Sequence, residues 1–264
     1  MALFLSESVH SGAKVSLHEA MAEVMEVVTE GAELGEAILR ADYILHVQSQ
    51  SLQEGEMVDK AKGFLRSAYE KVKAFILKLV AKVKQFVYAL VQRIKGWFGK
   101  AEIKDDQSYY VNGSAMARAK ARATVLSSLA GKTFDTMDEV SGEIKQLNKD
   151  TLDAIEGKAS DEKVIVKGSV IREAMKSVEG AISQLNKSEA TLKKRLGNAE
   201  KAVADAEKLT GSDAKSKQED ASKALEAARA NAKFVTSGLI PGANHCYSLL
   251  LAARPTWTKQ KEEK

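Results

Sequence analysis

The chain has 264 residues and a net charge of +4, with 44% hydrophobic and 29% charged residues. This balance is typical of an ordered protein with a sizeable core, and it excludes a largely disordered chain or a collagen-like fibre. Two prolines, few aromatic residues and many Ala, Lys, Glu and Leu residues favour helices. We therefore predict an all-α fold, an elongated bundle of long amphipathic helices.

Membrane-spanning and disulfide-stabilised classes are also excluded. Cys246 is the only cysteine, so no internal disulfide can form, and we expect its thiol to be a small buried apolar group. Lysines interrupt the most hydrophobic region, so no run of about 18 apolar residues can form a spanning helix. The first ten residues lack the basic and apolar stretches of a secretory signal, and we expect no export by that route.

An acidic segment comes first. Between Glu19 and Asp59 there are ten acidic residues and one arginine, a net charge of −9. Glutamates spaced by three and four residues predict an acidic stripe on a helix from Leu17 to Gln48, followed by a connector over 49–55. We interpret residues 1–54 as an acidic helical leader and a candidate propeptide.

A basic segment with an eleven-residue repeat follows. Between Lys60 and Lys100 eleven bases and one acid give a net charge of +10. From Lys60 the sequence aligns without gaps as KAKGFLRSAYE, KVKAFILKLVA, KVKQFVYALVQ and RIKGWFGKAEI. The first and third positions are always basic: Lys60, Lys62, Lys71, Lys73, Lys82, Lys84, Arg93 and Lys95. The fifth position is always aromatic: Phe64, Phe75, Phe86 and Trp97.

This repeat predicts one long basic amphipathic helix within residues 55–104. Eleven residues make three turns of a slightly relaxed helix, so each column stays on one face. The aromatic column belongs to an apolar stripe, and the two basic columns flank that stripe. From Lys60 to Phe98 the helix would measure roughly 58 Å at 1.5 Å per residue.

Three interpretations of the basic helix remain open. Its apolar stripe can pack on other helices as part of the core, which is the usual meaning of such a stripe. The stripe can instead insert into a membrane surface. Alternatively, the flanking lysines can bind nucleic acid through its phosphates, without sequence preference and with strong salt dependence. The neighbouring acidic segment would then pair with the basic helix or mask it, unless both are simply solvated faces.

Residues 105–264 are predicted to form a further helical bundle with a C-terminal tail. Residues 104–113 are interpreted as a polar linker, and residues 163–170 as a short strand or extended connector. Thr136 and Glu139 have the spacing of a capping box. Gly197 is interpreted as a helix stop, and Pro241 as part of a turn before a short apolar helix. The predicted helices run over 114–130, 136–156, 169–196, 199–209 and 212–239.

No motif of catalysis or metal binding occurs. The sequence lacks phosphate-binding loops, nucleophile elbows and paired cysteines, and His245 beside Cys246 has no further ligands at a recognised spacing. We therefore expect no enzymatic activity, no metal and no cofactor.

An acidic helical leader ahead of a lysine-rich helical body resembles the internal head or prohead core proteins of large tailed bacteriophages. In that family a protease removes the leader by cutting after a glutamate in a Leu-x-Glu or Ile-x-Glu context. Within the first hundred residues, three matching triplets precede Ala or Gly; they end at Glu19, Glu36 and Glu54, and the last lies before Gly55. The resemblance implies processing between Glu54 and Gly55, which would change the net charge from +4 to +11.

The resemblance implies a non-enzymatic virion protein of the capsid interior, located in the host cytoplasm during assembly. Its partners would be packaged DNA or capsid proteins, contacted through the eight basic residues of the repeat. The alternatives are a helical protein that binds a membrane surface and a purely structural scaffold subunit. Self-association through the long helices is a further expectation.

Overall fold

The computed structural model describes residues 54–101, 103–156, 163–209, 212–253 and 258–259, and there the chain is mainly helical, as predicted. The helices are α3 (Glu54–Ala101), α4 (Gly113–Leu129), α5 (Met137–Glu156), α6 (Gly168–Gln184), α7 (Lys187–Lys208), α8 (Ser212–Phe234) and α9 (Ile240–Ala253), with a π-helical segment η1 (Val235–Leu239). The strands are β1 (Ser108–Asn112), β2 (Lys163–Lys167) and β3 (Thr258–Lys259). The predicted leader, apart from Glu54, lies outside the described residues.

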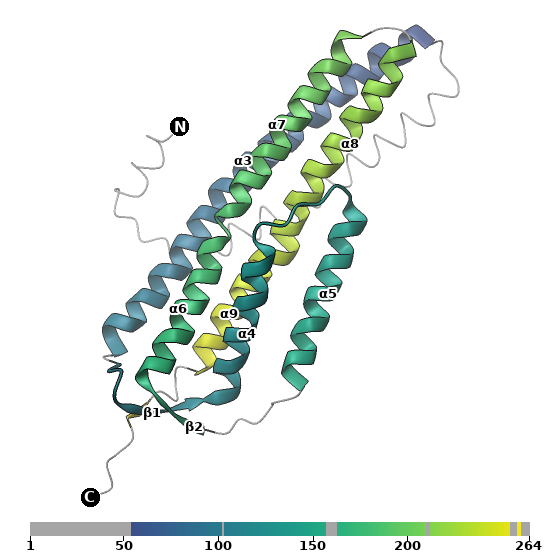
Figure 1. Cartoon of the computed structure of the whole chain (residues 1–264). Helices are drawn as coiled ribbons and strands as arrows, with labels where there is room; N and C mark the ends of the chain where they lie inside the picture. The colour runs from purple at the N-terminus through teal and green to yellow at the C-terminus, as the bar shows by residue number, and fades with distance from the viewer. Residues whose placement is uncertain (1–53, 102, 157–162, 210–211, 254–257, 260–264) are drawn as a thin grey trace, which may run out of the picture.

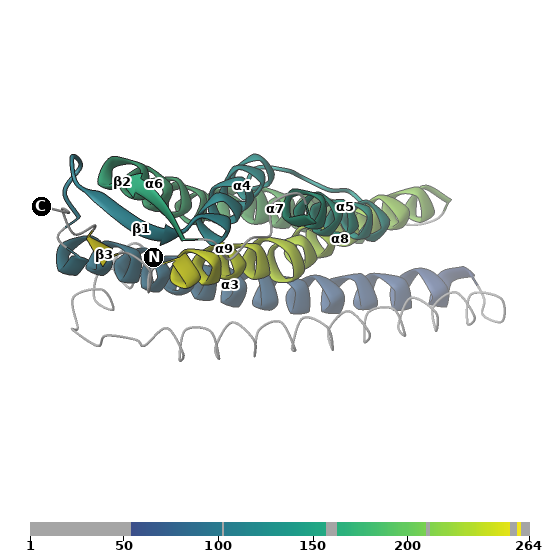
Figure 2. The same cartoon turned by 90° about the horizontal axis from the view of Figure 1, so that it is seen from below.

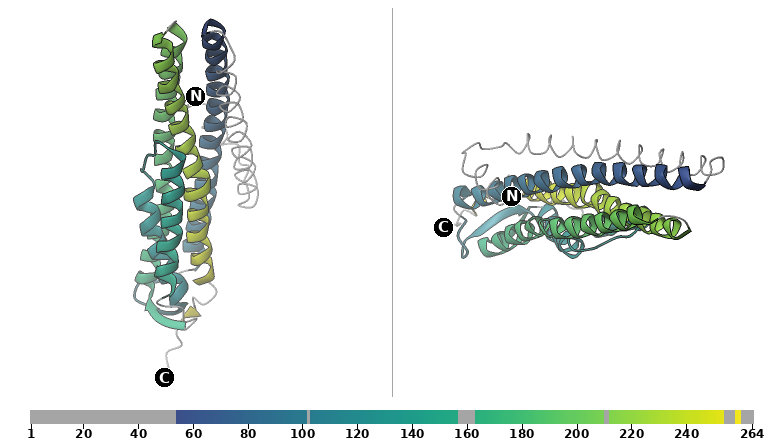
Figure 3. Two further views of the ribbon diagram at one scale, coloured as in Figure 1. Left: turned by 90° about the vertical axis from the view of Figure 1, so that its right-hand side faces the viewer. Right: turned by 90° about the horizontal axis from the view of Figure 1, so that it is seen from above.

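Three rods run side by side along the molecule (Figures 1 and 3). The first is α3, whose 48 residues span about 72 Å at 1.5 Å per residue. The second consists of α6 and α7 end to end, and the third of α8, η1 and α9. Helix α4 packs on α6 and α9, and α5 packs on α8. The predicted elongated bundle of long helices is therefore present, and the helix predicted from Lys60 to Phe98 is part of α3.

The second rod breaks at a different residue from the one predicted. The prediction of a helix over 169–196, a stop at Gly197 and a separate helix over 199–209 is wrong, because Gly197 lies inside α7. The break lies at Leu185 and Asn186, whose amides bond to the carbonyls of Ile182 and Ser183, three residues back. Such tight turns keep the backbone helical, so α6 and α7 remain nearly in line.

The third rod continues through Pro241, where the sequence suggests a turn. Pro241 is the second residue of α9, and the π-helical segment η1 directly precedes that helix. A proline inside an α-helix removes one hydrogen bond and its ring meets the carbonyl four residues back. A π-helical turn widens the helix at this point, so the chain continues without a turn.

The sheet lies at one end of the rods, and it corrects the predicted linker over 104–113. Strand β1 occupies the second half of that segment and pairs antiparallel with both β2 and β3, in the order β2-β1-β3. Tyr109 and Val111 are buried while Ser108, Tyr110 and Asn112 are only partly buried, which is the alternation of a half-buried strand. The short strand predicted within 163–170 is β2.

The helices predicted over 114–130 and 136–156 begin within one residue of α4 and α5. The side chain of Asn112 accepts a hydrogen bond from the Ala115 amide at 2.9 Å and caps α4. Before α5, the Glu139 amide donates to Thr136 Oγ1 at 3.3 Å and the Thr136 amide donates to Glu139 Oε2 at 3.4 Å. The predicted capping box is confirmed.

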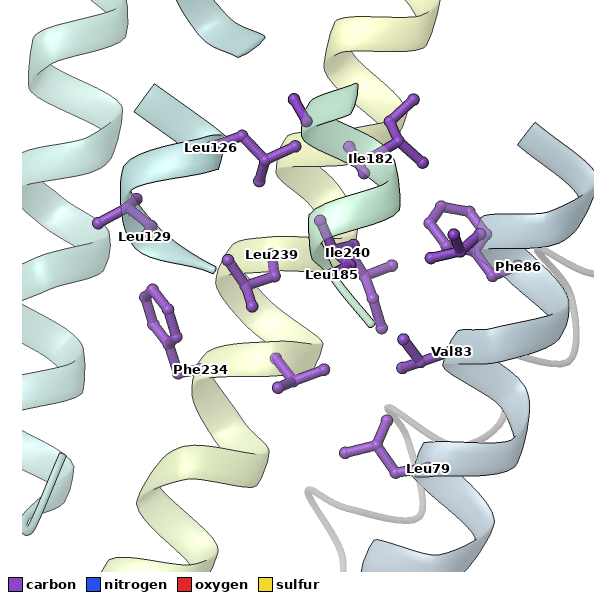
Figure 4. Packing of buried hydrophobic residues seen from close by; sticks show 14 of the residues in the cluster. Leu79, Val83, Phe86, Leu126, Leu129, Ile182, Leu185, Phe234, Leu239 and Ile240 are labelled. Atoms are coloured by element: carbon purple, nitrogen blue, oxygen red, sulfur yellow. The ribbon is translucent and has the colours of Figure 1, made fainter. Parts of the chain in front are cut away.

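All described helices contribute to one hydrophobic core. Figure 4 shows its middle, where side chains of α3 point toward residues of α4, α6, α8, η1 and α9. The labelled members are Leu79, Val83, Phe86, Leu126, Leu129, Ile182, Leu185, Phe234, Leu239 and Ile240. In the part of the chain that the structure describes, no helix is long and apolar enough to cross a lipid bilayer.

Candidate functional site: the basic flanks of helix α3

The apolar stripe of α3 is covered by the rest of the bundle. Val72, Ile76, Leu79 and Leu90 are fully buried, and Phe86 is almost so. These side chains pack toward α6, α7 and α8, which lie along α3 in the views of Figures 1 and 2. Because water is already excluded from the stripe, its burial stabilises the fold itself.

The aromatic column follows the same pattern where its side chains are described. Phe86 is buried, and Phe64 and Phe75 are partly buried against the core. The side chain of Trp97 lies outside the described residues. The aromatic residues of the repeat therefore contribute to packing between helices.

Two lysines in the third column of the repeat form ion pairs with the neighbouring rod of α6 and α7. The column consists of Lys62, Lys73, Lys84 and Lys95. Lys84 Nζ bonds to both carboxylate oxygens of Glu189 on α7, each at 2.8 Å. Lys95 Nζ lies 3.3 Å from Glu179 Oε1 on α6. These two lysines thus hold α3 against the second rod by charge as well as by their apolar stems.

A buried tyrosine holds a third lysine of this column. Lys73 Nζ lies 5.5 Å from the centre of the Tyr69 ring, a cation–π geometry, and Arg66 approaches the same ring. Burial, and then the nearby Glu200 carboxylate, raise the pKa of Tyr69 to about 12. Lys62 is half-exposed and makes an interaction of its own.

The first column is more open to solvent. Lys71 and Arg93 are exposed, whereas Lys82 is half-exposed and has an interaction partner. The side chain of Lys60 lies outside the described residues. The eight predicted contact residues are therefore not one uniform surface, because Lys84 and Lys95 form ion pairs with a neighbouring helix whereas Lys71 and Arg93 are exposed.

The face of α3 opposite the stripe is exposed. Tyr88 is 56% exposed, and Gly63, Ala74 and Gln85 are also on the surface. Glu54 and Gly55, the predicted processing site, are the first two residues of α3, and their side chains lie outside the described residues. A protease binds its substrate as an extended strand, so cutting there requires the first turn of α3 to open.

A second basic cluster was not predicted from the sequence. Arg118 and Arg122 on α4 lie beside His245 on α9, and Arg122 is only 6% exposed. The available signal was the four-residue spacing of the two arginines in an alanine-rich helix, which places both on one face. That spacing is common on solvated helices, and the burial of this face arises from packing against other helices, α9 among them.

The described residues contain no cluster of three His, Cys, Asp or Glu side chains that could hold a metal ion. Comparison with known proteins gives no relative: no family model, curated protein or solved structure matches the chain.

Proposed function

We propose that the chain is a non-enzymatic structural protein, and that it serves as an internal head protein of a tailed bacteriophage. The structural role is supported by one observation: the apolar stripe of α3 is buried in a core that the three helical rods share. Such a bundle offers a long, stiff body with a charged surface. The viral location rests on the resemblance of the first hundred residues, with the acidic segment before the basic one.

In this proposal, α3 contacts packaged DNA or the capsid interior through its first column alone. Lys71 and Arg93 are exposed cations 22 positions apart on one face, about 33 Å at 1.5 Å per residue. Each phosphate that they neutralise releases a counterion, so affinity falls as salt rises. Lys84 and Lys95 contribute less, because Glu189 and Glu179 already hold them.

A DNA-retention experiment tests this surface. The double variant Lys71→Gln/Arg93→Gln should weaken binding to duplex DNA and lower the slope of log affinity against log salt by about 1.8, since each phosphate contact contributes about 0.9. The matched control is Lys194→Gln/Lys201→Gln, which removes two exposed lysines from α7. If both variants lose affinity equally, binding is a general effect of net charge and α3 is not the contact surface.

The leader requires a separate experiment. A chain that begins at Gly55 carries a net charge of +11, against +4 for the whole. It should bind duplex DNA more tightly at low salt, provided that circular dichroism shows the helices to be intact. Equal weak binding by both chains would disprove masking by the leader, and mass spectrometry of the naturally produced protein would show whether Glu54 is its processing point.

A purely structural scaffold is the second candidate, and the sealed stripe together with the Lys84 and Lys95 ion pairs favours it. It predicts that neither DNA nor membrane binds at physiological salt. A membrane-surface role would require α3 to leave the bundle, because the stripe that would enter the lipid is buried. Liposome flotation beside DNA retention at equal ionic strength distinguishes the three.

A further inference from the structure

Two arginines of α4 lie at its interface with α9 without any carboxylate partner among the described residues. Arg122 is buried and Arg118 is half-buried. Their four-residue spacing puts both side chains on the same face of the helix. Charged groups are almost never this deeply buried unless an opposite charge accompanies them.

Their hydrogen bonds are incomplete. Arg122 Nη1 donates to the backbone carbonyl of Leu147 on α5 at 3.3 Å. The buried Nε atoms of Arg118 and Arg122 have no hydrogen-bond partner. A guanidinium has five N–H donors, so most of the donor capacity of Arg122 is unused. Burial lowers its pKa, but an arginine keeps its charge at neutral pH.

The described residues around the two arginines supply no negative charge at neutral pH. His245 on α9 faces the arginines, and burial, Arg122 and Arg118 each lower its pKa, so the imidazole is neutral at pH 7. Cys246 is a buried thiol, and burial raises its pKa to about 12. Glu173 of α6 is held by Lys120, which at 100° per residue lies on the opposite side of α4 from Arg122.

We propose that Arg118, Arg122 and His245 form a binding site for one small oxyanion, a phosphate or a carboxylate. The planar forks of two guanidinium groups match the oxygens of such an anion, and the imidazole can add a further hydrogen bond. Gly242 brings the backbone of α9 close to this site, since a Cβ there would lie 3.9 Å from Arg122 Nη2. The inference is independent of the proposed function, because α3 contributes no residue.

The direct test uses the full chain and inorganic phosphate. Phosphate is titrated against chloride at matched ionic strength, and the Nε–Hε NMR resonance of Arg122 and the melting temperature are followed. We expect a saturable shift of the resonance, a rise in melting temperature and a higher pKa of His245, because a bound anion offsets the two positive charges. A parallel titration with acetate shows whether carboxylates also bind. Saturation by either anion supports the site, and no saturable change with either refutes it.

Two variants separate the site from general ion effects. Arg122→Met should lose the anion-dependent rise in melting temperature, and without anion it should be at least as stable as the original chain, because it no longer buries an unpaired charge. The matched control Arg172→Met removes an arginine of α6 that is paired with Asp105, and it should keep the full response. An undiminished response in Arg122→Met would overturn the proposal. If that variant does not fold, the shift of the Arg122 resonance on titration of the original chain decides whether the anion binds at this site.

Discussion

The Lys84–Glu189 contact shows that a lysine at a conserved position of the repeat can join two packed helices. Both side chains are less than a third exposed, and the pair joins α3 to α7. Burial opposes ionisation of Glu189, but hydrogen bonds from Lys193 and Lys84 outweigh it, so the pKa of this carboxyl is lowered. A lowered pKa means that the folded protein prefers the charged form.

This pair predicts a pH-dependent contribution to stability. It is fully present above the ordinary carboxyl pKa of about 4.3 and is lost as pH falls through the lower folded-state value. Glu189→Gln should therefore lower the free energy of unfolding at pH 7 by about 1 kcal/mol and reduce its loss in acid. Urea unfolding from pH 7 to pH 3 measures both effects.

An exposed pair supplies the control. Asp205 and Lys208 lie three residues apart on the surface of α7. Asp205→Asn should cost less than about 0.5 kcal/mol at pH 7, as expected for a solvated ion pair. Equal effects of the two substitutions would mean that the Lys84–Glu189 contact does not hold α3 to its neighbour.

The burial of Cys246 predicts that its thiol reacts only when the protein unfolds, locally or globally. It is fully buried, and burial raises its pKa from the usual value to about 12. Folding therefore stabilises the neutral thiol, a contribution that is complete below the unfolded pKa of about 8.5 and is lost as pH rises toward the folded value. At pH 8 a thiol reagent should label the native chain far more slowly than the urea-unfolded chain. Equal labelling rates would contradict the buried position.

At the scale of elements, Gly168 links the sheet to the bundle. It follows β2 and begins α6, and its amide donates to the Gln107 carbonyl at 2.8 Å, just before β1. A Cβ at this position would collide with the carbonyl oxygen of Lys104. The backbone itself forms the obstacle, so no side-chain rotation relieves it.

Gly168→Ala should therefore destabilise the fold by at least about 2 kcal/mol, a typical cost of overpacking. Gly197→Ala in α7 is the matched control, because nothing lies within 4 Å of the Cβ that it would add. This control should gain up to about 1 kcal/mol from helix propensity. Thermal unfolding of both variants measures the difference, and stabilisation by both would refute the close contact at Gly168.

The sequence predicted elements well where the signal was local. The repeat predicted α3, and the spacing of Thr136 and Glu139 predicted the start of α5. Strand β1 was missed because its strand character depends on pairing with β2, more than fifty residues away. The break at Leu185 and the π-helical segment before Pro241 were missed because Gly197 and Pro241 were interpreted as helix ends, whereas both residues lie inside helices. The buried basic cluster, like β1, was missed because Arg122 is buried only by helices distant in sequence.

At the scale of the whole molecule, α3 belongs to the core and is not a detachable arm. Its buried side chains share one cluster with α4 and with α6 to α9. The energy of burying this stripe is of the order of 25 cal/mol per Å² of apolar surface, which is lost if α3 leaves the bundle. The apolar face of the basic segment therefore contributes to the core. Only its solvent-exposed residues, such as Lys71 and Arg93, are available to another molecule.

Native-state hydrogen exchange along α3 tests this central claim most directly. If the stripe is core, amides between Val72 and Leu90 should exchange only through global unfolding, with the same free energy as the slowest amides of α6, α7 and α8. Exchange of that stretch at a distinctly lower free energy, while the other helices stay protected, would show that α3 detaches by itself and would contradict the account.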